Sequence, residues 1–188
     1  MKKINKKELW SIPNLMGYFR ILLIPVFCFV YLRADSLKDY YIAAGILLVS
    51  TITDFLDGQI ARRFNMTTEF GKFLDPVADK ITHGAIAICL MFRYHYMKYL
   101  VLLMLIKEGF MAVMGIINLR HGTKLDGAKW FGKVCTASLF LVLMVLVFLP
   151  EISISAANLL IIGEMIIMFI TFLLYIPEFY RMKQTWND

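Results

Sequence analysis

Four aspartates with helical spacing stand out in a strongly apolar chain. Asp54 and Asp57 are three residues apart, and Asp75 and Asp79 are four apart. Side chains at these spacings lie on one face of a helix, so two adjacent helices would bring the four carboxylates to one point. Hard oxygen ligands without histidine or cysteine suit magnesium, manganese or calcium rather than zinc. The spacing therefore predicts a divalent-metal site formed by Asp54, Asp57, Asp75 and Asp79.

The composition indicates that this site belongs to a membrane protein. Apolar residues make up 60% of the 188 residues, and the mean hydropathy is +0.68, whereas roughly half of a soluble domain is apolar. Charges at bilayer depth are costly, so the aspartates need cations. Arg20 lies a turn or two into the first apolar stretch, and Lys80 directly follows Asp79. Both are candidates to balance the charge of the aspartates.

Six apolar stretches are long enough to cross a bilayer, which takes about 20 helical residues. We expect membrane helices over residues 15–32, 40–60, 74–92, 99–119, 131–149 and 156–176. The predicted fold is an all-α integral membrane bundle of six transmembrane helices in one domain, residues 15–177. A basic segment, residues 1–14, precedes it and a tail, residues 178–188, follows it.

Two features concern how the chain sits at the membrane. The basic start is not a cleavable signal peptide, because it has no long apolar core; it forms either a short N-terminal interfacial helix or a basic tail. Loops with many lysines and arginines stay in the cytoplasm. With the N-terminus inside, only Arg33, Lys38, Arg93 and Lys98 fall outside. Both termini and the aspartates are therefore predicted to face the cytoplasm.

The aspartates belong to a longer pattern. It reads Asp54-x2-Asp57-Gly58-x2-Ala61-Arg62-x8-Gly71-x3-Asp75-x3-Asp79. At every position it resembles the signature of the CDP-alcohol phosphatidyltransferases, membrane enzymes of phospholipid synthesis. Eight specified positions would almost never align by chance at ordinary residue frequencies.

The resemblance implies a reaction and roles for the signature residues. A phosphatidyl group passes from CDP-diacylglycerol to an acceptor alcohol, and CMP is released. The family's pattern implies two Mg²⁺ or Mn²⁺ ions bound by Asp54, Asp57 and Asp75, with Asp79 as metal ligand and catalytic general base. It also implies a homodimer in the cell membrane, and no nucleic-acid partner.

The small and basic signature residues are assigned to the CDP-lipid by the same resemblance. They are Gly58, Ala61, Arg62 and Gly71, with Gly71 expected in the turn before the third span. A planar guanidinium such as that of Arg62 suits phosphate oxygens. The alternative for Gly58 and Ala61 is close helix packing, which is common in membranes.

The acceptor follows from stretches in and around the signature. Residues 11–15, 20–25, 70–76 and 78–80 look most like the phosphatidylglycerophosphate synthase branch of the family, whose acceptor is glycerol 3-phosphate. The cardiolipin synthase branch, which uses phosphatidylglycerol, shares much of this sequence and remains the alternative.

A phosphate-bearing acceptor needs cations, and Lys107, Arg120 and Lys133 are the candidates. At the positions of Lys107 and Glu108, the phosphatidylglycerophosphate synthase branch usually has arginine followed by glutamate. The alternative is that Lys107 pairs with a nearby acid such as Glu164 and that the loop cations set the topology.

Two other classes of protein fit the aspartates alone. A divalent-cation transporter or a calcium-binding membrane protein could also hold a metal with four carboxylates. A transporter would carry polar residues along a path to both faces, whereas the outer halves of these helices are almost purely apolar. Neither class explains the small and basic residues at fixed offsets from the acids. His83 is expected to be a structural, hydrogen-bonded residue, and Glu164 has no assigned role.

Overall fold

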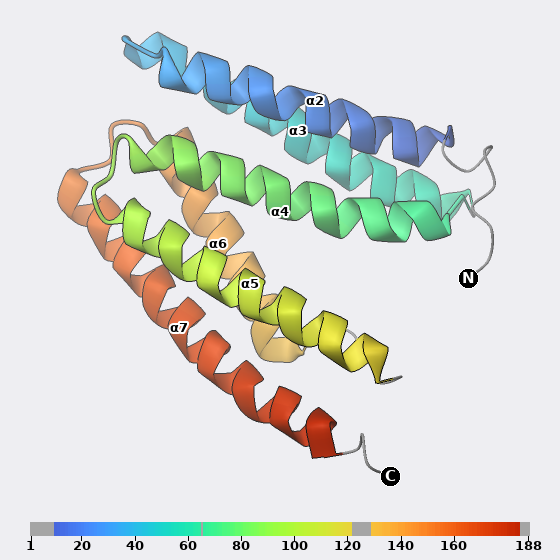
Figure 1. Cartoon of the computed structure of the whole chain (residues 1–188). Helices are drawn as coiled ribbons and strands as arrows, with labels where there is room; N and C mark the ends of the chain where they lie inside the picture. The colour runs from blue at the N-terminus through green and yellow to red at the C-terminus, as the bar shows by residue number, and fades with distance from the viewer. Residues whose placement is uncertain (1–9, 65, 122–128, 185–188) are drawn as a thin grey trace. The chain divides into compact units, whose positions relative to one another are not determined.

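The computed structural model describes residues 10–64, 66–121 and 129–184, and these ranges form six α-helices and no strand (Figure 1). The helices are α2 (Ile12–Leu32), α3 (Leu37–Arg63), α4 (Glu69–Met91), α5 (Met97–Arg120), α6 (Trp130–Phe148) and α7 (Ile154–Gln184). The all-helical class is therefore confirmed. The predicted N-terminal interfacial helix falls largely on residues 1–9, which lie outside the described residues.

Five of these helices are long and apolar enough to cross a membrane, namely α2, α3, α5, α6 and α7. The prediction of membrane helices is thus confirmed for five of six. The sequence of α4 contains Asp75, Asp79 and Lys80 in addition to Glu69 and Lys72, so the charges of the candidate site lower its apolar character. α7 also continues to Gln184, beyond residue 177, where the tail was expected to begin.

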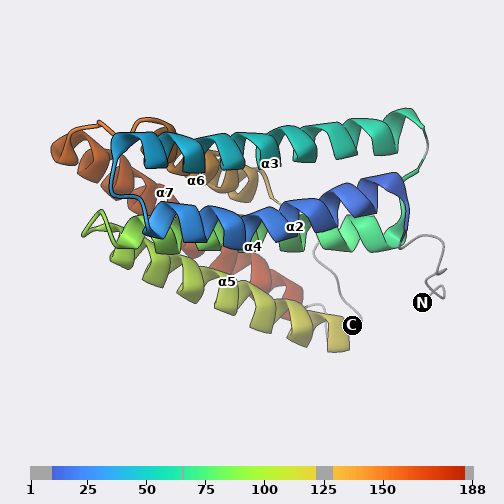
Figure 2. The same ribbon diagram turned by 90° about the horizontal axis from the view of Figure 1, so that it is seen from above.

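The chain forms two compact units. The first contains α2, α3 and nearly all of α4, and the second contains α5, α7 and most of α6. Within the first unit, the start of α2, the end of α3 and the start of α4 lie at the same end of the three helices (Figures 1 and 2). The candidate site lies toward this end. A single domain over residues 15–177 stays a prediction.

Local sequence signals fix where α2 and α3 begin. α2 follows Ser11 and has Pro13 in its first turn, where proline is favoured because its missing N–H is not needed. α3 opens with a capping box: Asp39 N donates to Ser36 Oγ at 3.3 Å, and Ser36 N donates to Asp39 Oδ2 at 3.0 Å. Such a cap contributes about 1 kcal/mol. The short connection makes α2 and α3 an antiparallel pair.

α4 begins five residues earlier than expected. Thr68 precedes the helix, and its Oγ1 accepts a hydrogen bond from Gly71 N at 2.9 Å, which is the geometry of an N-cap. Gly71 therefore lies in the first turn of α4 and not in the turn before it. This corrects the expectation, which rested on the apolar run alone.

The first unit has a small-residue core. Ala43 and Ala44 of α3 and Ala78 of α4 are buried, together with Phe27 of α2 and Leu47 of α3. Small side chains allow helices to approach closely. Close approach is what lets one arginine reach carboxylates on both neighbouring helices.

In the second unit, aromatic rings hold α7 against α5 and α6. Phe110 of α5 makes edge-on contacts with Phe172 and Phe179 of α7, at centroid distances of 5.3 and 5.6 Å. Phe131 of α6 packs edge-on against Tyr175 of α7 at 4.8 Å. Edge-to-face pairs of this kind add about 0.5–1.5 kcal/mol beyond the burial of their surface.

Candidate functional site

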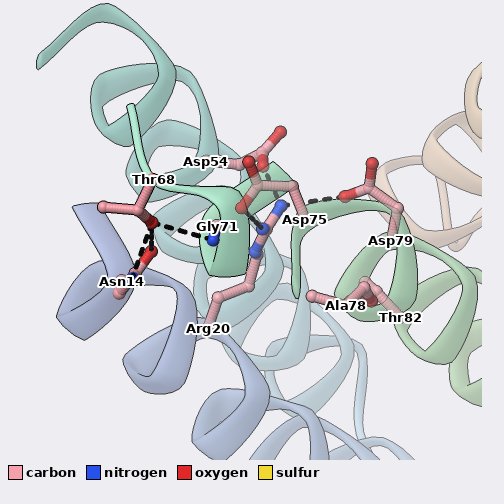
Figure 3. A network of polar contacts seen from close by, with 9 residues as sticks. All are labelled: Asn14, Arg20, Asp54, Thr68, Gly71, Asp75, Ala78, Asp79 and Thr82. Carbon is pink, nitrogen blue, oxygen red and sulfur yellow. Dashed lines mark hydrogen bonds and ion pairs between the residues drawn. The ribbon is translucent and has the colours of Figure 1, made fainter. Parts of the chain in front are cut away.

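A buried arginine connects the predicted metal ligands (Figure 3). Arg20 Nη1, from α2, donates to Asp54 Oδ1 of α3 and to Asp79 Oδ1 of α4, the second at 2.9 Å. Arg20 Nη2 lies 3.9 Å from Asp75 Oδ1. Three helices thus meet at one guanidinium, and the expected role of Arg20 as a counter-charge is confirmed.

The four side chains differ sharply in exposure. The Arg20 side chain is 3% exposed, whereas those of Asp54, Asp75 and Asp79 are 46%, 53% and 47% exposed. The guanidinium therefore lies on the protein side of the carboxylates, which are open on the other side. Three carboxylates face one guanidinium, so two negative charges within this group remain uncompensated.

Asp57, the fourth predicted ligand, is set apart from this group. It is 4% exposed, and its Oδ2 has no hydrogen-bond partner among the described residues. Burial of a carboxylate oxygen without a donor or cation costs at least about 1–3 kcal/mol. The position of Asp57 is therefore suited to a positive ligand.

A cleft of about 330 Å³, part of it open to solvent, lies beside Asp57. It is lined by Pro13 and Asn14 of α2, Asp57, Gly58 and Ala61 of α3, Met66, Thr67 and Thr68 of the connection, and Gly71 and Asp75 of α4. Three of the four residues assigned to the CDP-lipid line this cleft together with two predicted metal ligands. The signature thus maps to one place in space, although its halves are separated in the sequence.

Arg62, the fourth residue assigned to the CDP-lipid, is not part of the cleft lining. Its Nε donates to the carbonyl oxygen of Gly58 at 3.0 Å, one turn earlier in α3. The side chain is exposed and lies over Gly58, where its Nη2 would be 3.8 Å from an added Cβ. Arg62 therefore lies next to Gly58 of the cleft lining, and its bond to the Gly58 carbonyl oxygen uses Nε and not a terminal nitrogen.

Sequence reasoning assigned no role to the other five residues of the cleft, and two of these, Asn14 and Thr68, make polar contacts there. Asn14 Nδ2 donates to Thr68 Oγ1 at 3.2 Å, and a Cβ at position 71 would lie 2.8 Å from Asn14 Oδ1. Gly71 is thus required for the close approach of α2 to the start of α4. Two signals pointed here: a polar residue in the first turn of an apolar helix, and a threonine three residues before a glycine at a helix start.

The residues predicted to bind the acceptor lie in the second unit. Lys107 is buried in α5, and its Nζ is 2.9 Å from Glu108 Oε1. Arg120 and Lys133 are exposed. Thirteen residues of α5 separate Arg120 from Lys107, about 20 Å along a helix. The structure therefore does not place Lys107 and Arg120 within reach of one phosphate group.

Glu164 of α7, for which the sequence indicated no role, is 1% exposed. Ser138 lies beside it, but neither carboxylate oxygen has a partner in hydrogen-bond geometry in the described part of the chain. Lys107 interacts with it electrostatically. The second unit thus contains a buried cation with an adjacent acid on its own helix and another on α7.

The donor set of the first unit fits a hard divalent ion. Asp54, Asp75 and Asp79 offer exposed carboxylates, and Asp57 has a buried oxygen without a partner; carboxylate oxygens are the ligands that magnesium and manganese prefer. No group of three or more His, Cys, Asp or Glu side chains in the described ranges is arranged to hold an ion. Two of the carboxylates are instead bonded to Arg20.

Comparison with known proteins agrees with this site. Residues 10–177 match the CDP-alcohol phosphatidyltransferase family, a range that includes all the signature residues. The chain therefore belongs to this family of membrane transferases in phospholipid biosynthesis.

Curated relatives refine the comparison. The chain is 34% identical over 153 residues to the CDP-diacylglycerol–glycerol-3-phosphate 3-phosphatidyltransferase of Escherichia coli K12, covering 79% of this chain and 83% of the relative. It is 35% identical over 147 residues to the protein of the same name from Shigella flexneri serotype 5b, covering 76% and 80%.

Proposed function

We propose that this protein transfers the phosphatidyl group of CDP-diacylglycerol to glycerol 3-phosphate, forming phosphatidylglycerophosphate and CMP. The observation that carries the proposal is the cleft of the first unit, whose lining joins Asp57, Gly58 and Ala61 of α3 with Gly71 and Asp75 of α4. The names of the two relatives, both CDP-diacylglycerol–glycerol-3-phosphate 3-phosphatidyltransferases, support the choice of substrates.

In this proposal the cleft binds the CDP part of the donor. Gly58 and Ala61 have little or no side chain, so a nucleotide can approach the backbone of α3, and Gly71 lines the cleft at the start of α4. Arg62 beside the cleft contributes a guanidinium with two terminal nitrogens, a geometry suited to phosphate oxygens.

Asp54, Asp57, Asp75 and Asp79 would hold Mg²⁺ or Mn²⁺, two ions in the arrangement common in phosphoryl transfer. Ions bound there would offset the charge of the diphosphate and of the departing CMP. The carboxylates contribute the negative charge that binds such ions, and Arg20 holds Asp54 and Asp79 in place.

Asp79 acts as general base in this proposal. The acceptor hydroxyl oxygen forms a bond to the phosphorus of the phosphatidyl group, and the bond from that phosphorus to the bridging oxygen of CMP breaks. The hydroxyl proton passes to the Asp79 carboxylate. Its side chain is half-exposed, so a substrate hydroxyl can reach it, and general bases must come within hydrogen-bond distance of the proton.

The phosphate of glycerol 3-phosphate requires a cationic partner. Lys107 is the proposed contact, because a buried intramembrane charge is functional by default. Its bond to Glu108 would have to be exchanged for one to the phosphate. Lys133, which is exposed near the start of α6, is proposed as a further acceptor contact, whereas Arg120 is too far from Lys107 along α5 to bind the same phosphate.

The membrane arrangement completes the proposal. α4 forms a sixth membrane helix, in which Asp75 and Asp79 belong to the polar site, so these two charges do not face lipid. The distribution of lysine and arginine favours a cytoplasmic site and cytoplasmic termini in the cell membrane. A homodimer is proposed from the family resemblance alone.

CMP release by the purified protein tests the proposal. The protein in detergent is given CDP-diacylglycerol with Mg²⁺ or Mn²⁺, and glycerol 3-phosphate and phosphatidylglycerol are offered in separate reactions. We expect CMP release that depends on glycerol 3-phosphate, with one phosphatidylglycerophosphate formed per CMP. Release that depends on phosphatidylglycerol would assign cardiolipin synthesis instead, and no release with either acceptor would contradict the proposed reaction.

A further inference from the structure

We propose that Arg20 is a positioning residue for the divalent ions: it binds Asp54 and Asp79 on the protein side, so that the open side of each carboxylate faces the ion. This inference rests on the proposed metal-dependent reaction and adds a residue outside the signature. It concerns how the acids are held, and it assigns Arg20 no contact with the substrates.

The geometry separates Arg20 from the open side of the site. Its side chain is almost fully buried, whereas the three aspartates around it are about half-exposed. Figure 3 shows the guanidinium approaching from α2, with Asp54 and Asp79 reaching it from α3 and α4. The Oδ1 atoms of Asp54 and Asp79 accept its hydrogen bonds, so each Oδ2 is left for another partner.

The single nitrogen Nη1 makes both of these bonds. It therefore fixes the distance between a carboxylate of α3 and a carboxylate of α4, which belong to the two halves of the signature. Without this bridge the aspartates repel one another, because like charges a few ångströms apart are only partly screened near a protein surface. Their side chains would then turn apart toward solvent.

Two roles for Arg20 predict opposite effects on metal affinity. If Arg20 only neutralises the acids, it competes with the ion, and its removal should tighten metal binding because a positive charge is lost. If Arg20 positions the acids, its removal should weaken binding, as loss of a residue that orients metal ligands typically does, by about 10–100-fold. The sign of the change therefore identifies the role.

The test is Mn²⁺ binding to the full chain in detergent, without substrates, measured by electron paramagnetic resonance of the free ion. Arg20→Gln should raise the Kd about 10–100-fold. Arg20→Lys keeps the charge but loses the planar guanidinium. Its Kd for Mn²⁺ should lie between that of the wild type and that of Arg20→Gln. Arg33→Gln removes the same charge from the exposed end of the same helix and should leave the Kd within about twofold, because exposed charges this far apart are largely screened.

Each outcome has a separate meaning. A Kd for Arg20→Gln that is unchanged or lower, in protein with wild-type helicity and a single chromatographic peak, would overturn the positioning role. If Arg20→Gln does not fold, Arg20→Lys decides, and a wild-type Kd for it would overturn the proposal. Absence of Mn²⁺ binding by the wild type would overturn the metal role in the proposed function and this inference with it.

Discussion

The two compact units each bury one cation against carboxylates, in very different ways. In the first unit Arg20 reaches Asp54 and Asp79 on two other helices. In the second unit Lys107 is paired with Glu108, its neighbour on the same helix. The first arrangement connects three helices through one guanidinium, whereas the second is local to α5.

Their exposure also differs. The acids around Arg20 are about half-exposed, whereas Glu108 is 32% exposed and Glu164 is almost completely buried. The exposed carboxylates of the first unit can bind ions without first losing an ion pair. Lys107, by contrast, must exchange Glu108 for any anion that it binds. The first unit therefore offers open carboxylates to the proposed ions, whereas anion binding at Lys107 requires rearrangement of an ion pair.

The largest expected effect is on the chemistry assigned to the first unit. Asp79→Asn should lower kcat by about 100–10,000-fold, because a general base contributes on this scale. Binding of CDP-diacylglycerol should change little, since Asp54, Asp57 and Asp75 remain. Single-turnover CMP release and equilibrium donor binding measure the two quantities, with Asp35→Asn in the connection before α3 as control. Loss of donor binding equal to the loss of kcat would make Asp79 chiefly a binding or structural residue.

The next effect concerns the second unit. Lys107→Ala should raise the KM for glycerol 3-phosphate about 10–100-fold, because a charged hydrogen bond contributes about 1.5–3 kcal/mol, and the KM for CDP-diacylglycerol should change little. Steady-state kinetics with each substrate varied in turn give both constants. An equal rise in both KM values would indicate that Lys107 supports the fold and does not bind the acceptor.

A smaller effect is expected on the stability of the cleft. Gly71→Ala should destabilise the protein by about 1–3 kcal/mol, because the new Cβ would lie 2.8 Å from Asn14 Oδ1 and 3.1 Å from Thr68 Oγ1. Gly45→Ala on α3 is a matched control, since its Cβ meets nothing within 4 Å. Thermal unfolding of both variants tests this. Equal melting temperatures would show that α2 and the start of α4 are not held as closely as described.

The smallest effect separates ligand binding from packing at Gly58. A Cβ there has only Arg62 Nη2 at 3.8 Å as a neighbour, so Gly58→Ala should fold with unchanged or slightly higher stability. If the nucleotide approaches this backbone, donor affinity should still fall several-fold, since about 1 kcal/mol corresponds to a factor of five. Equilibrium binding of CDP-diacylglycerol measures it. Wild-type affinity would mean that the donor does not use this wall of the cleft.

Much of the first unit was predictable from the sequence. The apolar runs gave α2 and α3 as membrane spans, and helical spacing placed Asp54, Asp75 and Asp79 around one point with Arg20 as their cation. The bonds of Thr68 and Asn14 to one another were not predictable, because they join residues 54 positions apart and short polar side chains carry no periodic signal. The start of α4 is missed for a different reason: a local cap, the bond from Gly71 N to Thr68 Oγ1, and not an apolar run determines it.

In the second unit the helices were predictable as membrane spans, but the grouping of the cations was not sound. Lys107, Arg120 and Lys133 share only their charge, and thirteen positions of α5 already place Arg120 about 20 Å from Lys107. The pairing of Lys107 with an acid was considered, yet its partner is the adjacent Glu108. Burial of a charged side chain depends on how three helices pack, which the pattern of one helix does not specify.

The central claim is that the cleft of the first unit binds the nucleotide of the donor. The most direct test is photo-crosslinking with a CDP-diacylglycerol whose cytosine carries a photoreactive group, followed by mass spectrometry of the labelled peptides. We predict labelling at the start of α2, the end of α3 or the start of α4, and its suppression by excess CDP. Specific labelling confined to α5, α6 or α7 would contradict the claim.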